Sequence, residues 1–147
     1  MVEIIKKYDE NIIHFSLNPI TSINKPGQLV DLSLYKICKK LNIYFNLTKC
    51  FYINELNSPQ SRGKHSNNNA SEILFCLQGT FELKLNTGNK SIHIHLKKNE
   101  AIFINKNIWI EFFNFENCII LAFVDIDFNE EKKSCYEFEE FIKMNKN

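Results

Sequence analysis

The chain is built from short apolar segments rich in Ile, Phe and Val, most of them separated by Gly, Pro or Asn. Apolar and polar side chains alternate most clearly at 80–85 and 91–96, as they do in strands that bury one face. The residues between these segments, 86–89 (Asn-Thr-Gly-Asn), have the composition of a tight hairpin turn. Strands at this close spacing predict an all-β domain, either a sandwich or a barrel.

Seven segments have strand character by this criterion: 50–53, 72–77, 80–85, 91–96, 101–104, 109–114 and 118–125. Residues 32–41 are compatible with a helix or with an irregular segment. A clearer helix candidate lies at 129–143, where large apolar side chains recur on one stripe among Glu and Lys. Because no linker or internal repeat interrupts the chain, we expect residues 1–147 to form a single domain with a short C-terminal helix.

The composition excludes several classes of protein. With 44% hydrophobic and 24% charged residues among 147, the chain is long and apolar enough to fold around its own core. A net charge of +1 gives no support for nucleic-acid binding. No segment approaches the roughly 20 apolar residues of a membrane span. Five scattered cysteines without a CxxC pair, and an N-terminus without a signal-peptide core, predict a reduced protein in the cytoplasm.

The polar segment 58–72 concentrates the candidate chemistry between two predicted strands. It holds Arg62, the single arginine of the chain, together with His65 and Glu72. Side chains two residues apart on an extended strand point to the same face. His65 and Asn67 are therefore expected to face the same side of the domain.

The spacing H-x-N-x4-E-x6-G, which runs from His65 to Gly79, is similar to the first motif of the cupins. In their double-stranded β-helix (jelly roll) this face lines an interior cavity. A metal there needs three or four ligands, typically with at least two imidazoles. Asn67 and Ile110 stand where the cupin motifs have two of these histidines, so we expect no metal at this site.

The other histidines are weaker candidates. His93 and His95 share one strand face with Ser91 and Lys97, which indicates a solvent-exposed face rather than a pair of metal ligands. His14 lies in an apolar stretch without an evident partner, which indicates a structural role.

Residues 62–65 (Arg-Gly-Lys-His), followed by the strand at 72–79, resemble the signature of the sugar-nucleotide 3,4-ketoisomerases, the WxcM-like cupins. The segments 49–53 and 107–111 resemble the family's strand before the signature and its tryptophan-containing segment after it. The likeness extends over roughly residues 15–142, and the motifs keep their order and spacing throughout.

This resemblance implies an activity and a mode of assembly. Members of the family move the carbonyl of dTDP-4-keto-6-deoxy-glucose from C4 to C3, for the 3-amino sugars of surface polysaccharides. The family needs neither a metal nor an organic cofactor. Its members are homodimers with exchanged N-terminal strands, and exposed edge strands favour such pairing on physical grounds too.

The resemblance also implies roles for individual residues. His65 is the expected proton-transfer group, because an imidazole titrates near neutral pH and the reaction passes through an enediol. Asn67 can hold the enolate oxygen through its amide. Arg62 is expected to bind the diphosphate, since a guanidinium fork matches phosphate oxygens.

Three further residues are expected near the substrate. Tyr52 can hydrogen-bond a sugar or phosphate oxygen at the cavity mouth. Glu72 replaces a glutamine of the family, and burial would raise the pKa of its carboxyl group. Trp109 packs either against the ligand or in the core, which is the commoner place for a tryptophan on a strand.

Two departures from the family leave a second hypothesis open. Asn67 and Ile110 occupy the positions of two further family histidines. The alternative to an active isomerase is therefore a catalytically degenerate cupin that binds a nucleotide sugar or assembles with pathway enzymes. A weaker alternative is an epimerase or isomerase for another nucleotide-linked sugar.

Overall fold

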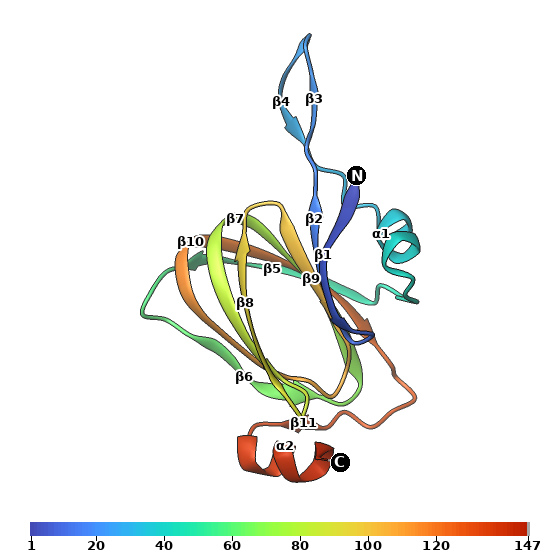
Figure 1. The fold of residues 1–147 in the computed structure, drawn as a ribbon, viewed down its shortest axis with the longest axis vertical. Coiled ribbons are helices and arrows are strands. Elements are labelled where there is room, and N and C mark those ends of the chain that lie inside the picture. The colour runs from blue at the N-terminus through green and yellow to red at the C-terminus, as the bar shows by residue number, and fades with distance from the viewer. Residues whose placement is uncertain (147) are drawn as a thin grey trace.

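The computed structural model describes residues 1–146, which form eleven strands and two short helices (Figure 1). In chain order these are β1 (Val2–Asp9), β2 (Ile12–Leu17), β3 (Ile20–Ser22), β4 (Lys25–Leu29), α1 (Leu34–Leu41), β5 (Lys49–Leu56), β6 (Arg62–Asn67), β7 (Ala70–Asn86), β8 (Ser91–Lys97), β9 (Glu100–Ile104), β10 (Trp109–Ile126), β11 (Ser134–Cys135) and α2 (Phe138–Asn145). The predicted β architecture with a short C-terminal helix is confirmed. Among residues 1–146, no helix is long and apolar enough to cross a membrane.

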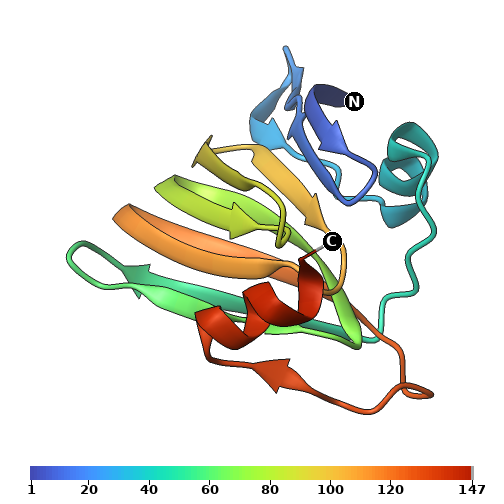
Figure 2. The same cartoon turned by 60° about the horizontal axis from the view of Figure 1, so that its bottom comes forward.

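Nine of the strands form one hydrogen-bonded sheet that folds over on itself. Its central strands, β7 and β10, pair with each other along most of their length. Residues 70–78 of β7 and 119–126 of β10 form a first layer with β1, β2, β9 and β5. Residues 80–86 and 109–113 form a second layer with β8, β6 and β11. The two layers enclose the main core between them (Figures 1 and 2).

A glycine lies where β7 passes from one layer to the other. Gly79 has a φ of +70°, and a Cβ at this position would clash with the backbone carbonyl oxygens of Glu116 and Asn117 on β10. β10 is irregular at the same level, with register shifts between Phe113 and Ile120. The left-handed backbone and the close approach of the two strands both require glycine here, which explains the glycine that ends the sequence motif.

Successive side chains of β7 point to opposite faces of the first layer and so belong to two different hydrophobic clusters. Leu74 and Cys76 face the space between the layers. Ile73 and Phe75 face the opposite side of the first layer, where they pack in a cluster with Ile37 of α1. Glu72 continues the inward-facing series of β7, and this places a carboxyl group at the edge of the main core.

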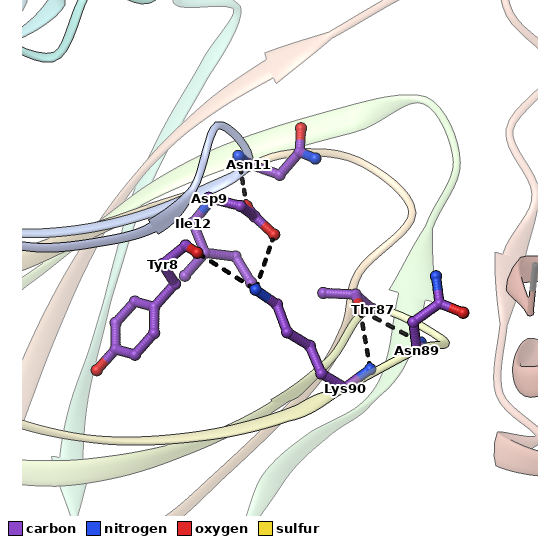
Figure 3. Close-up of polar contacts among 7 residues, drawn as sticks. All are labelled: Tyr8, Asp9, Asn11, Ile12, Thr87, Asn89 and Lys90. Atoms are coloured by element: carbon purple, nitrogen blue, oxygen red, sulfur yellow. Dashed lines mark hydrogen bonds and ion pairs between the residues drawn. The ribbon is translucent and has the colours of Figure 1, made fainter.

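The two layers are tied together along one side by contacts between turns (Figure 3). Nζ of Lys90, after the β7–β8 turn, donates to the carbonyl oxygen of Tyr8 at 3.2 Å and lies 3.5 Å from Oδ2 of Asp9. Oδ1 of Asp9 accepts a hydrogen bond of 2.7 Å from the backbone N–H of Asn11. β5 and β6 each pair with β10 but not with each other, and the short segment 57–61 connects them.

A separate hairpin of β3 and β4 projects from the body of the molecule (Figure 1). Ile20, Ile23 and Leu29 on this hairpin are exposed apolar side chains.

The structure differs from the sequence prediction at both ends of the chain. The helix predicted at 129–143 is confined to α2, because residues 134–135 pair with β6 instead. β1 and β2 were not predicted, since β1 is mostly polar and exposed while β2 is buried almost throughout. Neither strand shows the alternation that marked the others.

Candidate active site

β6 brings the polar signature to the interior of the second layer, where His65 lies opposite Ile110 of β10. Side chains three apart on a regular strand point to opposite faces. Gly63 and Lys64 both have positive φ angles, of 86° and 59°, and this breaks the alternation. Arg62 and His65 therefore line the same cavity. A Cβ on Gly63 would lie 2.7 Å from the carbonyl oxygen of Ile110, so the close approach to β10 also depends on glycine.

A cavity of about 150 Å³ lies between the layers, and three of its side chains are polar: Arg62, His65 and Glu72. Its other lining residues are Phe51, Ile53, Gly63, Leu74, Ile110, Phe112 and Ile120. A cavity of about this size accommodates one six-membered ring. The structure thus brings together the three polar residues that the sequence analysis grouped from one short segment.

His65 and Glu72 reach this cavity from opposite layers. His65 lies on β6 in the second layer. Glu72 lies on β7 in the first layer, in register with Ile104 of β9 and Val124 of β10. A ligand in this cavity would therefore lie between an imidazole on one layer and a carboxyl group on the other.

Asn67 contacts the imidazole of His65 and is itself held by the C-terminal segment. Nδ2 of Asn67 lies 3.4 Å from Nε2 of His65. Oγ of Ser134 on β11 donates a hydrogen bond of 2.9 Å to Oδ1 of Asn67. Because the amide oxygen is engaged by Ser134, the amide N–H₂ is turned towards the ring, and Nε2 of His65 is the acceptor. The amide of Asn67 is thus fixed between Ser134 and the ring of His65.

The aromatic ring of Tyr136 lies beside the imidazole ring of His65. The ring centroids of Tyr136 and His65 are 5.8 Å apart, with an angle of 31° between the planes. Tyr136 follows directly after β11, which pairs with β6 through Ser66 and Asn67. The segment after the main sheet is therefore part of the site.

A larger cavity, of about 500 Å³, adjoins the smaller one. Glu72 and Phe51 line both cavities. The other residues of the larger cavity are Lys49, Asn67, Asn69, Ala70, Val124, Ile126, Phe128, Glu130 and Lys132. Lys49 and Lys132 line the larger cavity, and Arg62 lines the smaller one. Both cavities therefore carry cationic side chains, which suit an anionic ligand.

Glu72 has an unusual electrostatic environment. Its burial raises the pKa of the carboxyl group to about 7, and the nearby charge of Lys49 opposes this rise only in part. The carboxyl group is therefore partly protonated near neutral pH. This agrees with the direction expected from the sequence for a buried glutamate at this position.

Tyr52 and Trp109 line neither cavity. Tyr52 is on the outward face of β5, 66% exposed, because its neighbours Phe51 and Ile53 take the inward positions. Trp109 is buried at the end of the second layer, where its ring lies 5.2 Å from that of Phe138 on α2. Trp109 was expected either against the ligand or in the core, and the structure places it in the core.

The remaining histidines lie outside the cavities. Nε2 of the buried His14 is 3.1 Å from Oε1 of Glu100, a partner that the sequence did not reveal. Nε2 of the exposed His93 is 2.9 Å from Oε1 of Glu82. Within residues 1–146, no group of three or more His, Cys, Asp or Glu side chains is arranged to hold a metal ion.

Sequence reasoning missed three residues of the site. Phe51 could have been found, because strict alternation puts it on the same face as Ile53 and puts Tyr52 on the other face. Ser134 and Tyr136 carried no local signal, since they lie in a segment predicted as helix and reach the site only through the pairing of β11 with β6.

The chain matches one protein-family model over most of its length. Residues 13–146 match the family model described as FdtA: WxcM-like, C-terminal. A TDP-4-oxo-6-deoxy-alpha-D-glucose-3,4-oxoisomerase of Aneurinibacillus thermoaerophilus is 24% identical over 112 residues, which cover 76% of this chain and 81% of that protein.

Two solved structures show similar folds over nearly the whole chain. A 3,4-ketoisomerase from Helicobacter canadensis has a TM-score of 0.75 and 26% identity, covering 90% of this chain and 96% of that one. WlaRA, a TDP-fucose-3,4-ketoisomerase from Campylobacter jejuni, has a TM-score of 0.74 and 27% identity, covering 92% and 96%. The chain belongs to this FdtA family, whose model is described as WxcM-like, C-terminal.

Proposed function

We propose that this protein is a TDP-sugar 3,4-ketoisomerase that converts dTDP-4-keto-6-deoxy-glucose into its 3-keto isomer. The observation that carries the proposal is the position of His65, whose imidazole lines a ring-sized cavity beside the amide of Asn67. Membership of the family and the activities named for its relatives support the same reaction. The proposal assigns no metal and no organic cofactor.

The reaction needs a base next to a carbon acid. The C3 proton of the substrate is acidified by the C4 ketone, and its removal gives an enediol. A neutral imidazole is a suitable base at neutral pH, and we assign this step to His65. One amide hydrogen of Asn67 faces the ring of His65, and we assign the second to the oxyanion that develops on the sugar.

Substrate binding is assigned to the cationic groups around the cavities. The sugar ring occupies the smaller cavity, and the exposed guanidinium of Arg62 reaches the diphosphate from its rim. Lys49 and Lys132 on the larger cavity are the other candidates for a phosphate contact. Tyr52 and Trp109 have no place in this assignment, because neither lines one of these two cavities.

We also propose that the protein works as a homodimer in the cytoplasm. The projecting β3–β4 hairpin, with Ile20, Ile23 and Leu29 exposed, is the part of the single domain that would exchange with a second copy. All five cysteines are free, which suits a reducing compartment. Size-exclusion chromatography with light scattering, on the wild type and on Ile23→Asp, measures the assembly.

The test is direct. Purified protein is incubated with dTDP-4-keto-6-deoxy-glucose, and the sugar is followed by proton NMR. The wild type is expected to form the 3-keto isomer, and His65→Asn is expected to bind TDP in calorimetry without forming product. Wild-type protein that binds TDP but leaves the sugar unchanged would establish the degenerate binding protein instead. Exchange of the C5 proton rather than the C3 proton would establish an epimerase.

A further inference from the structure

Movement of a ketone between neighbouring carbons requires two proton transfers to carbon. His65 is the single imidazole among the described residues that line the two cavities. We propose that the carboxyl group of Glu72 is the second proton-transfer group, which delivers a proton to C4 after His65 has taken the proton from C3. This inference rests on the proposed function and adds a catalytic residue to it.

The first support is position. Glu72 and His65 line the same cavity of about 150 Å³ from opposite layers of the fold. A sugar ring between them presents neighbouring ring carbons to different side chains. Ile110, which faces His65 across the β6–β10 pairing, is apolar and offers no proton.

The second support is that the carboxyl group of Glu72 is not engaged in a hydrogen bond or ion pair among the described residues. By contrast, Glu82 contacts His93 at 2.9 Å and Glu100 contacts His14 at 3.1 Å. A partly buried carboxyl group that makes no hydrogen bond within the protein leaves its proton available to a ligand.

The protonation state is compatible with this role. Burial in the largely apolar cavity raises the pKa of Glu72 to about 7, against the opposing charge of Lys49. The charged and titratable groups that share the two cavities with it are Lys49, Arg62, His65, Glu130 and Lys132. A general acid works best when its pKa lies near the working pH, so a carboxyl group in this range suits proton delivery.

The proposed steps conserve all atoms and electrons. The imidazole of His65 takes the C3 proton, the pair of the C3–H bond becomes a C3=C4 double bond, and the carbonyl pair moves to O4. The proton on O3 then passes to O4, O3 forms the new carbonyl with C3, and the double-bond pair takes the Glu72 proton at C4. The imidazolium finally returns a proton to the Glu72 carboxylate, so no oxidant or reductant is needed.

Solvent deuterium separates the two transfers. The wild type, Glu72→Gln and His65→Asn are incubated in D₂O with dTDP-4-keto-6-deoxy-glucose, and deuterium at C3 and C4 is followed by NMR. Glu116→Gln, an exposed position on β10 outside both cavities, is the matched control. Thermal melting and calorimetry with TDP check that each variant is folded and binds.

Glu72→Gln is expected to keep C3 exchange in the substrate while product formation falls at least about 100-fold. His65→Asn is expected to lose both, and Glu116→Gln neither. The inference is overturned if Glu72→Gln forms product at the wild-type rate, or if exchange and product formation fall together. A wild-type protein that forms no product refutes the proposed function itself, which is a different result.

A second measurement uses the wild type alone. Delivery of the C4 proton requires protonated Glu72, whereas C3 exchange requires only the base. The ratio of isomerisation to C3 exchange should therefore fall about tenfold per pH unit above about pH 7. A ratio that stays constant from pH 6 to pH 9 (roughly) contradicts the inference, whether or not the Glu72 variant folds.

Discussion

Oγ of Ser134 donates a hydrogen bond of 2.9 Å to Oδ1 of Asn67, although the two residues are 67 positions apart in the chain. In this arrangement the amide N–H₂ of Asn67, and not its oxygen, faces His65. If the amide were turned round, its oxygen instead of its N–H₂ would face Nε2 of the ring. The contact thus links the C-terminal segment to the base of the proposed reaction.

Ser134→Ala is expected to lower kcat about tenfold and to leave KM within about twofold, because Ser134 orients the base and touches no substrate. Ser134→Thr keeps a hydroxyl at this position and should restore most of kcat. Steady-state kinetics of the two variants test this expectation. A change in KM alone, or an alanine variant as active as the wild type, would contradict a positioning role.

Arg62→Ala is expected to weaken TDP binding by about 10- to 100-fold, since a charge-assisted hydrogen bond contributes roughly 1.5–3 kcal/mol. Arg62→Lys keeps the charge but loses the planar fork, so it should recover only part of the affinity. Isothermal titration calorimetry gives the dissociation constants. Lys49→Ala is the informative comparison, and a larger loss for Lys49→Ala would move the phosphate contact to the larger cavity.

Much of the fold follows from alternation in the sequence. The segments 72–77 and 80–85 were predicted as separate strands, and they are the two halves of β7 on either side of Gly79. Likewise, β10 joins 109–114 and 118–125. A local pattern cannot tell one bent strand from two strands, because the bend depends on contacts with a partner strand that is distant in sequence.

Less of the site could be predicted, for the same physical reason. Arg62 and His65 were grouped because they are neighbours in the chain, and the left-handed backbone at Gly63 keeps both on one cavity. Tyr52 was chosen over Phe51 for its hydroxyl group, although the strand geometry turns that hydroxyl outward. Tyr136 reaches His65 only through tertiary packing, which no local pattern encodes.

Glu72→Gln should also change stability in a pH-dependent way. The pKa of Glu72 is about 7 in the folded protein against 4.5 ordinarily, so the folded state binds more protons between these values. Stability contributed by the protonated form is therefore present below about pH 4.5 and lost as the pH rises towards 7. The glutamine variant should be more stable than the wild type by about 1–3 kcal/mol at pH 8.5, and equal to it near pH 4.5.

Urea denaturation at the two pH values measures this difference. The comparison between variant and wild type cancels the contributions of all other carboxyl groups. A stability gain that is the same at both pH values would show that the carboxyl group of Glu72 is not held in its neutral form by burial.

The thiols should differ sharply in reactivity. Cys50 is exposed, whereas Cys76 and Cys118 are each 1% exposed. A hydrogen bond with Cys118, together with burial, raises the pKa of the Cys76 thiol, and the thiolate is the reactive form. Iodoacetamide should label Cys50 first and the two buried thiols only in denaturant, as mass spectrometry can follow. Cys50→Ser should remove the fast phase, and rapid labelling of Cys76 in the native protein would contradict its burial.

The bend in β7 gives the sharpest test of the fold, because the chain offers a matched control. Gly79 and Gly27 have similar positive φ angles, of 70° and 82°, so alanine at either position suffers the same kind of backbone strain, about 1–2 kcal/mol. At Gly79 the new Cβ would also clash with the carbonyl oxygens of Glu116 and Asn117, whereas at Gly27 it meets nothing within 4 Å. Gly79→Ala is therefore expected to lower the free energy of unfolding by at least about 3 kcal/mol, and Gly27→Ala by about 1–2 kcal/mol. Urea unfolding of both variants measures the difference, and equal losses would mean that β7 and β10 do not approach each other at the bend.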